Sequence, residues 1–421
     1  MTKKELHLTV VFYFVFICFL FPSEPIKIAV ISDVHYLATS LAKKGDALAA
    51  YQNATGRNVE HLHEVLDSAL LQIEQKKVDI LFISGDITNH GEKASHLEFI
   101  QKLTKLQQSG IRVFVVPGNH DINVPDAKAY IGEKAVATAT ISAEEFATLY
   151  APFGYGEAIK RDSASLSYLV PVTDSLWLLA IDTNRYAEHT ASSISGGRIL
   201  PETLSWCRDM LRRAKEKNIS VVAMMHHGLV EHIPYQATFF PNYVVENWQK
   251  NARILADEGL QVVFTGHFHA NDITRFTSDK QNVLCDIETG SLAHYPFPYR
   301  IVTVQGKKMN IQSYVIEQIS QVPALQAVYE KKLEEKARKV VRSKLRTIPL
   351  PIPDETSRTL IDILARIAVM HAAGDEKPDD ELREKIQQFA FLLQQDEESV
   401  DFNQFQLDLP PQDNQLDIIL K

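Results

Sequence analysis

The sequence predicts an α/β fold followed by a small all-α C-terminal domain. From Ile26 to about Val315, short β-branched runs alternate with stretches whose apolar residues recur at three- and four-residue spacing. Most of the β-branched runs are apolar throughout, as expected when helices cover both faces of a sheet. After Ile319, long, charged, helix-favouring stretches replace them. A chain of 421 residues has enough material for one large core and a smaller unit.

The first residues differ from the rest. A basic start precedes an unbroken apolar stretch from Val10 to Phe21. This is typical of a secretory signal, and the stretch is shorter than the ~20 residues of a membrane-spanning helix. Residues 1–25 are therefore predicted to be a signal peptide or an N-terminal anchor, and the protein to be exported, either secreted or attached to a membrane. Whether this segment is cleaved, lipidated or retained stays open.

The large domain is predicted to span residues 26–318. Its clearest strands are Ile26–Ile31, Ile80–Ser84, Val113–Val116, Leu176–Ile181, Val221–Met225, Val262–Thr265 and Val302–Val304. Its clearest helices are Glu60–Gln75, Lys93–Ser109, Pro201–Lys217 and Val244–Glu258. The alternation of the two kinds of element indicates a sheet with crossover helices.

A helical domain is predicted over residues 319–396. Its helices are Pro323–Leu345, Asp354–Ala373 and Pro378–Gln395, with Asp354 and either Asp379 or Asp380 as N-caps. They carry no cluster of ligand-type residues, so they are expected to form a lid, a homodimer contact, or simple packing against the large domain. Residues 397–421 form a tail rich in Gln and Asp that either docks or is disordered.

Charge and cysteine content exclude several classes. The formal net charge is -9 and no long basic run occurs, so a nucleic-acid polymer is not expected as a partner. Cys207 and Cys285 do not form a CxxC pair, which argues against a thiolate metal site. A disulfide between them is conceivable in an exported protein, but both lie in ordinary apolar or amphipathic segments.

Five predicted strands end in residues able to bind a metal. These residues are Asp33, His35, Asp86, Asn119, His120, His226, His267 and His269. Loops at the carboxyl ends of strands meet at one edge of a sheet, so the side chains are expected to converge. Carboxylates, imidazoles and an amide oxygen suit Mn, Fe, Zn or Ni. The set is too large for one ion, whereas two ions ~3.5–4 Å apart sharing a carboxylate would use it.

At these residues the sequence resembles the calcineurin-like metallophosphoesterase superfamily. The signature D-x-H, G-D, G-N-H-[DE], a strand-end His and G-H-x-H is present in that order. The resemblance implies a four-layer αββα sandwich of two mixed β-sheets and two divalent or trivalent metal ions. One ion would be held by Asp33, His35 and His269 and the other by Asn119, His226 and His267, with Asp86 as the bridge. A hydroxide bridging the metals would attack the phosphorus of the substrate.

His120 is left without a metal by this assignment. It resembles the family histidine that stabilises the phosphate or protonates the leaving oxygen, a general-acid role that contributes roughly 10²–10⁴-fold. The next residue, Asp121, either orients a loop or histidine or caps a turn. His226 is expected to be a ligand because it is the first histidine after its strand. His227 then either supports the site or contacts substrate.

The expected substrate class follows from a departure from the family pattern. Protein phosphatases of the superfamily carry G-D-x-x-D-R-G, but Asn89 and His90 stand here in place of the Asp and Arg. The segment is closer to the small-molecule phosphodiesterase branch, which includes exported bacterial cyclic-nucleotide phosphodiesterases. We therefore expect hydrolysis of 3′,5′-cyclic nucleotides or similar small phosphodiesters, with Asn119, His90 and His227 as candidate substrate contacts.

The sequence leaves other functions and further site residues open. The alternatives are a phosphomonoesterase or nucleotidase, a cell-surface phosphodiester hydrolase, and a non-catalytic metal- or nucleotide-binding scaffold. Arg161 and Arg198 could meet a phosphate or be solvated, and His294 with Arg300 could reach the site. No role in the site is otherwise expected for His61, His63, His96, His189, His232 and His294.

Overall fold

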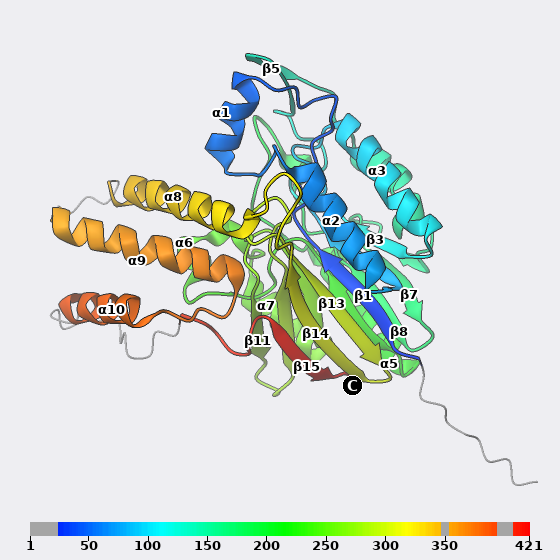
Figure 1. Cartoon of the computed structure of the whole chain (residues 1–421). Helices are drawn as coiled ribbons and strands as arrows, with labels where there is room; N and C mark the ends of the chain where they lie inside the picture. The colour runs from blue at the N-terminus through cyan, green and yellow to red at the C-terminus, as the bar shows by residue number, and fades with distance from the viewer. Residues whose placement is uncertain (1–23, 347–352, 394–406) are drawn as a thin grey trace, which may run out of the picture.

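The computed structural model describes residues 24–346, 353–393 and 407–421 (Figure 1). The predicted leader therefore lies almost wholly outside the described residues. Within these ranges, no helix is both long and apolar enough to cross a membrane. Cys207 and Cys285 are buried and free, so the conceivable disulfide between them is not formed.

A six-stranded sheet contains the first strands of the chain. β1 (Ile26–Ile31), β2 (Ile80–Ser84) and β3 (Arg112–Val116) run parallel. The sheet continues from β1 through antiparallel neighbours, in the order β15-β14-β13-β1-β2-β3. These neighbours are β13 (Pro298–Gln305), β14 (Lys308–Val315) and β15 (Gln415–Ile419).

A seven-stranded sheet, in the order β11-β12-β10-β9-β8-β7-β6, faces the first. Its parallel centre is β8 (Leu176–Ala180), β9 (Ser220–Met224), β10 (Val262–Thr265) and β12 (Val283–Glu288). Its antiparallel edges are β11 (Ile273–Thr277), β7 (Tyr168–Thr173) and β6 (Lys160–Arg161). A separate hairpin joins β4 (Lys128–Ile131) to β5 (Lys134–Ala137).

Helices cover the outer faces of both sheets. α2 (Leu62–Gln75) and α3 (Lys93–Gln108) pack into the core that contains β1, β2 and β3. α5 (Pro201–Glu216) and α7 (Trp248–Asp257) form a second core against β8, β9 and β10. Neighbouring residues of β8 divide between the cores, Leu178 joining the first and Leu179 the second. The predicted four-layer αββα sandwich is thus confirmed.

The remaining elements of this region are short. They are α1 (Asp46–Thr55), α4 (Ala143–Leu149), α6 (Gln236–Phe239) and the 3-10 turns Ala151–Phe153, Tyr186–Glu188 and Pro241–Tyr243. The helix expected to begin at Val244 begins at Trp248 instead. Val244 forms a bridge with Gly228, and Asn247 adopts a left-handed conformation that starts the helix.

The three predicted C-terminal helices are present as α8 (Leu325–Leu345), α9 (Asp354–Ala373) and α10 (Asp380–Leu393). They lie side by side and extend away from the two sheets (Figure 1). Asp379 caps α10, since its Oδ1 accepts a hydrogen bond from Leu382 N at 2.8 Å. The expected Asp354 cap is wrong, because Pro353 holds the cap position and Asp354 lies in the first turn.

The end of the chain forms a strand that the sequence pattern did not predict. Gln415–Ile419 adds β15 to the edge of β14, with Leu416 opposite Ile311 (Figure 1). Leu416 and Leu420 are buried, while Ile419 is exposed. The described part of the tail is therefore docked. A five-residue edge strand has too little periodicity to be recognised before its partner is known.

Candidate metal centre

The loops that follow β1, β2 and β10 have a tightly constrained backbone. Asp33, His35, Asp86 and His269 have φ of 49°, 47°, 46° and 62°, values that L-residues with side chains seldom adopt. The first two loops are tied together where His35 N donates to Asp86 O at 2.9 Å. Position 118 must be glycine, because a Cβ there would lie 2.1 Å from Asp86 N.

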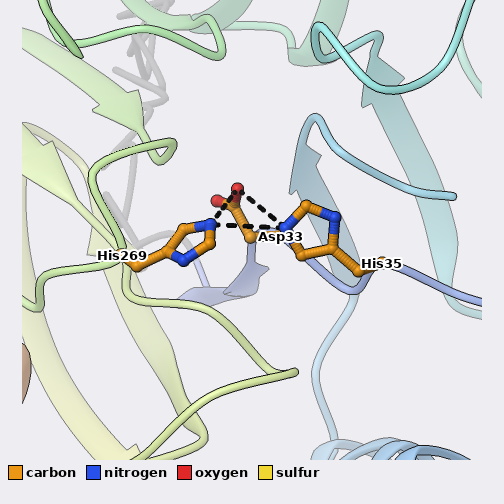
Figure 2. Close-up of side chains that lie close together, drawn as sticks. All are labelled: Asp33, His35 and His269. Atoms are coloured by element: carbon orange, nitrogen blue, oxygen red, sulfur yellow. Dashed lines mark hydrogen bonds and ion pairs between the residues drawn. The ribbon is translucent and has the colours of Figure 1, made fainter. Parts of the chain in front are cut away.

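One group of potential ligands comprises Asp33, His35 and His269 (Figure 2). His269 Nε2 lies 3.1 Å from Asp33 Oδ1 and 3.3 Å from His35 Nε2. The other oxygen of Asp33 accepts hydrogen bonds from Ser32 Oγ at 2.6 Å and His267 N at 2.9 Å. One carboxylate oxygen and two ring nitrogens therefore point at a common position.

A second group comprises Asp86, His226 and His267, all buried. His226 Nε2 lies 3.4 Å from Asp86 Oδ1 and 3.2 Å from Asn119 Oδ1, which brings the expected amide ligand into the group. His226 Nδ1 is 2.9 Å from Ser84 O, and His267 Nε2 is 3.0 Å from Asn242 O. Each of these imidazoles has one nitrogen fixed by a backbone carbonyl, which leaves the other for a metal.

Asp86 lies between the two groups. Its Oδ2 is 3.8 Å from His35 Nε2 and 4.0 Å from His120 Nε2, while Oδ1 faces His226. Burial would raise the pKa of Asp86, but the charges of His226 and His120 hold that pKa well below its ordinary value. Burial opposes protonation of His226, yet Asp86 raises its pKa to about 9. The donor set and the central carboxylate fit a pair of metal ions.

His120 and His90 face each other beside this centre, with ring centroids 4.7 Å apart. The backbone of His120 is fixed by a 2.8 Å hydrogen bond from its N–H to Asp86 Oδ1. Its ring also lies 5.4 Å from that of His35, and its side chain is 17% exposed. The structure thus places His120 at the rim of the centre and His90 directly against it.

Asp121 orients the loops beneath the centre. Its carboxylate accepts backbone hydrogen bonds from Gly118 at 2.7 Å, Thr88 at 2.8 Å and Ile87 at 3.1 Å. Burial and then the charge of Asp86 raise the pKa of Asp121 to about 7. Of the two roles considered for this residue, loop orientation is the one observed. The carboxylate ties the turn before Asn119 to the turn after Asp86.

His227 lies behind the site. Its Nδ1 is 2.7 Å from Thr183 Oγ1, its Nε2 is 3.0 Å from Ser195 O, and the side chain is fully buried against His226 and His267. Both ring nitrogens are therefore engaged by the protein. This position favours the supporting role over the substrate contact considered for His227.

Arg57 is a site-lining cation that the sequence analysis missed. Its Nη1 donates to Asn89 O at 2.9 Å, Asn89 Oδ1 at 3.0 Å and Tyr51 OH at 2.8 Å. Burial and, next, the positive charge of Arg57 lower the pKa values of His35 and His90, that of His90 to about 4. Arg57 has no motif of its own, so no sequence signal could have found it. It places a positive charge beside His35 and His90.

His294 also reaches the centre, which was one of the two possibilities that the sequence left open for this residue. Its ring lies 4.6 Å from that of His269, and its Nδ1 is 3.2 Å from Ser291 Oγ. Its position six residues after β12 was the available signal, since β12 is another parallel strand ending at this edge.

Other side chains proposed as possible site residues lie away from the centre. Arg161 lies on an edge strand, Arg198 pairs with Glu188, and Arg300 and His232 are buried around Asp272.

Two groups of candidate metal ligands at strand ends of a four-layer sandwich are the arrangement expected of a dinuclear metallohydrolase. The family profile for calcineurin-like phosphoesterases matches residues 26–271. The chain belongs to the calcineurin-like phosphoesterase family and is a metal-dependent phosphoester hydrolase. Members of this family use two divalent metal ions.

Comparison with individual proteins gives weaker similarities. A Coxiella burnetii protein named "probable cyclic nucleotide phosphodiesterase" is 24% identical over 255 residues, 59% of this chain and 77% of that protein. A dimetal phosphatase structure from Danio rerio is 14% identical, covering 69% of this chain and 96% of that chain with a TM-score of 0.48. Purple acid phosphatase from yellow lupin is 10% identical, covering 70% and 53% with a TM-score of 0.43.

Proposed function

We propose that this protein hydrolyses phosphodiester bonds in small molecules, with 3′,5′-cyclic nucleotides as the leading substrate class. The observation that carries the chemistry is the position of Asp86 between two groups of metal ligands. We assign Asp33, His35 and His269 to one ion and Asn119, His226 and His267 to the other. The mixed oxygen and nitrogen donors suit Mn, Fe, Zn or Ni. When bound, such a pair polarises a phosphate ester and activates water.

The chain's own residues position the ester and its leaving group. His120 is placed at the rim, where an imidazole can bind the phosphate or give a proton to the departing oxygen. His90 packs against its ring and limits how it can turn. Arg57, held in place by hydrogen bonds to Asn89, adds a fixed positive charge near these histidines, which favours an anionic substrate.

A group of aromatic side chains beside His267 supports a nucleotide as the substrate. Tyr243 lies 5.0 Å from the His267 ring and 4.8 Å from Phe268, and Phe240 lies 5.7 Å from Phe268. Phe240 is 41% exposed and Phe239 is 69% exposed. Exposed aromatic rings stack on nucleobases at ~1–3 kcal/mol per base. A base attached to a phosphate at the metals would have such a surface within reach.

The test is hydrolysis of bis-p-nitrophenyl phosphate, p-nitrophenyl phosphate and cyclic AMP by the full chain, before and after addition of Mn²⁺. We expect Mn²⁺-dependent cleavage of the first and third compounds and little of the second. Dominant cleavage of p-nitrophenyl phosphate would instead indicate the phosphomonoesterase alternative. Bound metal without hydrolysis of any of the three would favour a binding role.

The aromatic contribution can be separated from the chemistry. Phe240→Ala should raise KM for cyclic AMP roughly 5–150-fold, as the loss of one stacked base predicts. It should leave bis-p-nitrophenyl phosphate cleavage nearly unchanged if that smaller ester depends on the metals alone. Leu364→Ala is a matched control, because Leu364 is also 41% exposed but lies on α9. Equal losses on both substrates in Phe240→Ala would count against a nucleotide.

We also propose that residues 1–25 direct export. The support is the basic start and the apolar stretch Val10–Phe21, which match a secretory signal in length and order. Cell fractionation of the full chain and of a chain lacking residues 1–25 tests this. Recovery of both forms in the cytoplasm would contradict export.

A further inference from the structure

A further buried group of ligand-type side chains, outside the catalytic centre, lies behind the loop that carries His267 and His269. It comprises Asp272, His371 and Glu376, which we call the Asp272 cluster. His371 Nδ1 is 2.6 Å from Glu376 Oε1 and 3.6 Å from Asp272 Oδ2. The first of these separations is a direct hydrogen bond, and the three ligand atoms of the cluster lie within 4.8 Å of one another, as do those of the Asp33 group. Like that group, the Asp272 cluster brings an imidazole and carboxylate oxygens to one point.

The cluster contains buried oxygens with unused hydrogen-bonding capacity. Asp272 is 1% exposed and Glu376 5% exposed. Neither Asp272 Oδ2 nor Glu376 Oε2 has a hydrogen-bond partner among the described residues. Asp272 Oδ1 is already engaged by His232 Nδ1 at 2.7 Å, which leaves Oδ2 directed at His371. A buried carboxylate oxygen without a partner lowers the stability of the fold, so a bound cation would be expected to satisfy these two atoms.

Ionisable groups of both signs surround the cluster. Burial opposes protonation of His371, but its hydrogen bond to Glu376 and the charge of Asp272 raise its pKa. Burial and then the charges of Glu376 and Asp272 raise the pKa of Asp408 to about 6. The guanidinium of Arg300 is close, but it donates to the backbone carbonyls of Asp272, Glu288 and Asp413 rather than to carboxylates. Apart from His371 itself, the imidazole of His232 is the positively ionisable group that bonds directly to Asp272.

The neighbouring group of Asp375, Asp408 and Asp413 is different. Asp413 Oδ1 accepts from Ile273 N at 2.9 Å and Oδ2 from Asp375 N at 2.6 Å. Asp375 Oδ1 accepts from Asp413 N at 3.1 Å in return. The carboxylates of Asp375 and Asp413 fasten the chain end to the loop after α9, whereas Asp408 Oδ1 is buried without a hydrogen-bond partner among the described residues. The Asp272 cluster differs in combining two such oxygens with an imidazole.

We propose that the Asp272 cluster binds a third divalent metal ion, of the Zn²⁺ or Mn²⁺ class, separate from the catalytic pair. Two carboxylates and one imidazole form a donor set suited to these ions, and a structural site of this kind contributes directly to folding. The proposal is independent of the substrate proposed above.

A metal here would join the helical region to the catalytic loop. Asp272 ends the stretch that begins at Gly266, whereas His371 is in the last turn of α9 and Glu376 follows that helix. Phe268, between the ligands His267 and His269, packs against His371 with ring centroids 5.2 Å apart. The ion would hold α9 against this loop and fix the loop's far end. The helical region would then support the centre without contributing a ligand to it.

The experiment measures metal stoichiometry in the full chain. The protein is stripped with a chelator, dialysed against Zn²⁺, freed of unbound ion by gel filtration and analysed for zinc. We expect three ions per chain in the unmodified protein and two in Glu376→Gln. Glu335→Gln, the same change at an exposed position on α8, is the matched control and should keep three. Two ions in the unmodified chain, or three in Glu376→Gln, would overturn the proposal.

A second variant keeps the test decisive if Glu376→Gln does not fold. Replacing Asp33 and Asp86 together by Asn should remove the catalytic pair and leave one zinc per chain. That zinc should raise the unfolding temperature by on the order of 5 °C when present at about 100 times its Kd. Absence of zinc from this double variant would mean that the Asp272 cluster is only a set of buried ion pairs. Loss of hydrolysis alone would bear on the proposed function and not on this site.

Discussion

The catalytic centre and the Asp272 cluster use similar side chains but are assembled differently. Every ligand of the catalytic centre follows a parallel strand, and the strand ends of two facing sheets bring the ligands together. The Asp272 cluster joins one residue of the catalytic domain to His371 in the last turn of α9 and Glu376 just after that helix, about 100 residues later. The first arrangement follows from sheet topology, whereas the second depends on how a helical region docks. The comparison predicts that the two sites can be disabled separately.

Asp86→Ala should have the largest effect and break the catalytic centre alone. Removal of the central carboxylate should abolish hydrolysis, well beyond the roughly 10–100-fold losses typical of outer partners of a metal. Metal content should fall at the same time, as elemental analysis would measure. The metal of the Asp272 cluster should remain bound. Full activity in Asp86→Ala would exclude its assignment as the bridge.

His120→Ala should lower kcat by roughly 10²–10⁴-fold and leave metal content unchanged. The reason is that His120 lies at the rim, 4.0 Å from Asp86, and is not needed in either group of ligands. Steady-state kinetics together with elemental analysis separates this result from that of Asp86→Ala. Loss of a metal in this variant would make His120 a ligand.

Arg57→Gln should lower kcat/KM by roughly 10–100-fold, because it removes the positive charge held beside His35 and His90, which favours an anionic substrate. Gln can still bond to Asn89 but carries no charge, so the effect isolates the electrostatic part. Arg161→Gln offers a control, because Arg161 is exposed on the edge strand β6. If both variants behave alike, Arg57 has no special relation to the substrate.

Leu416→Ala should have the smallest effect and act on stability, not on catalysis. Leu416 is 7% exposed on β15, so its truncation should lower the free energy of unfolding by about 2 kcal/mol. Ile419→Ala on the same strand, 62% exposed, should change it by less than about 0.5 kcal/mol. Denaturant unfolding measures both. Equal, small changes would show that the docked chain end contributes little to the fold.

The sequence predicted well where local patterns and sheet topology suffice. β1, β2, β10 and α9 have the expected bounds, and each of the eight proposed centre residues lies at the edge where strand ends meet. Prediction failed where a partner distant in sequence defines the element or the contact. β15 exists because β14 offers an open edge, and Arg57 lines the site because Asn89 and Tyr51 hold it there.

The sequence by itself determined the family, the sandwich and the side chains that converge at the candidate metal centre. Buried parallel strands and the side chains immediately after them are encoded by contiguous residues, so a short motif carries the information. Only the tertiary structure decided that Arg57 and His294 face the centre, that His227 supports it from behind, and that Asp272 meets His371 and Glu376. These contacts depend on packing between distant segments, and no periodicity or spacing within one segment records which side chain its neighbour will meet.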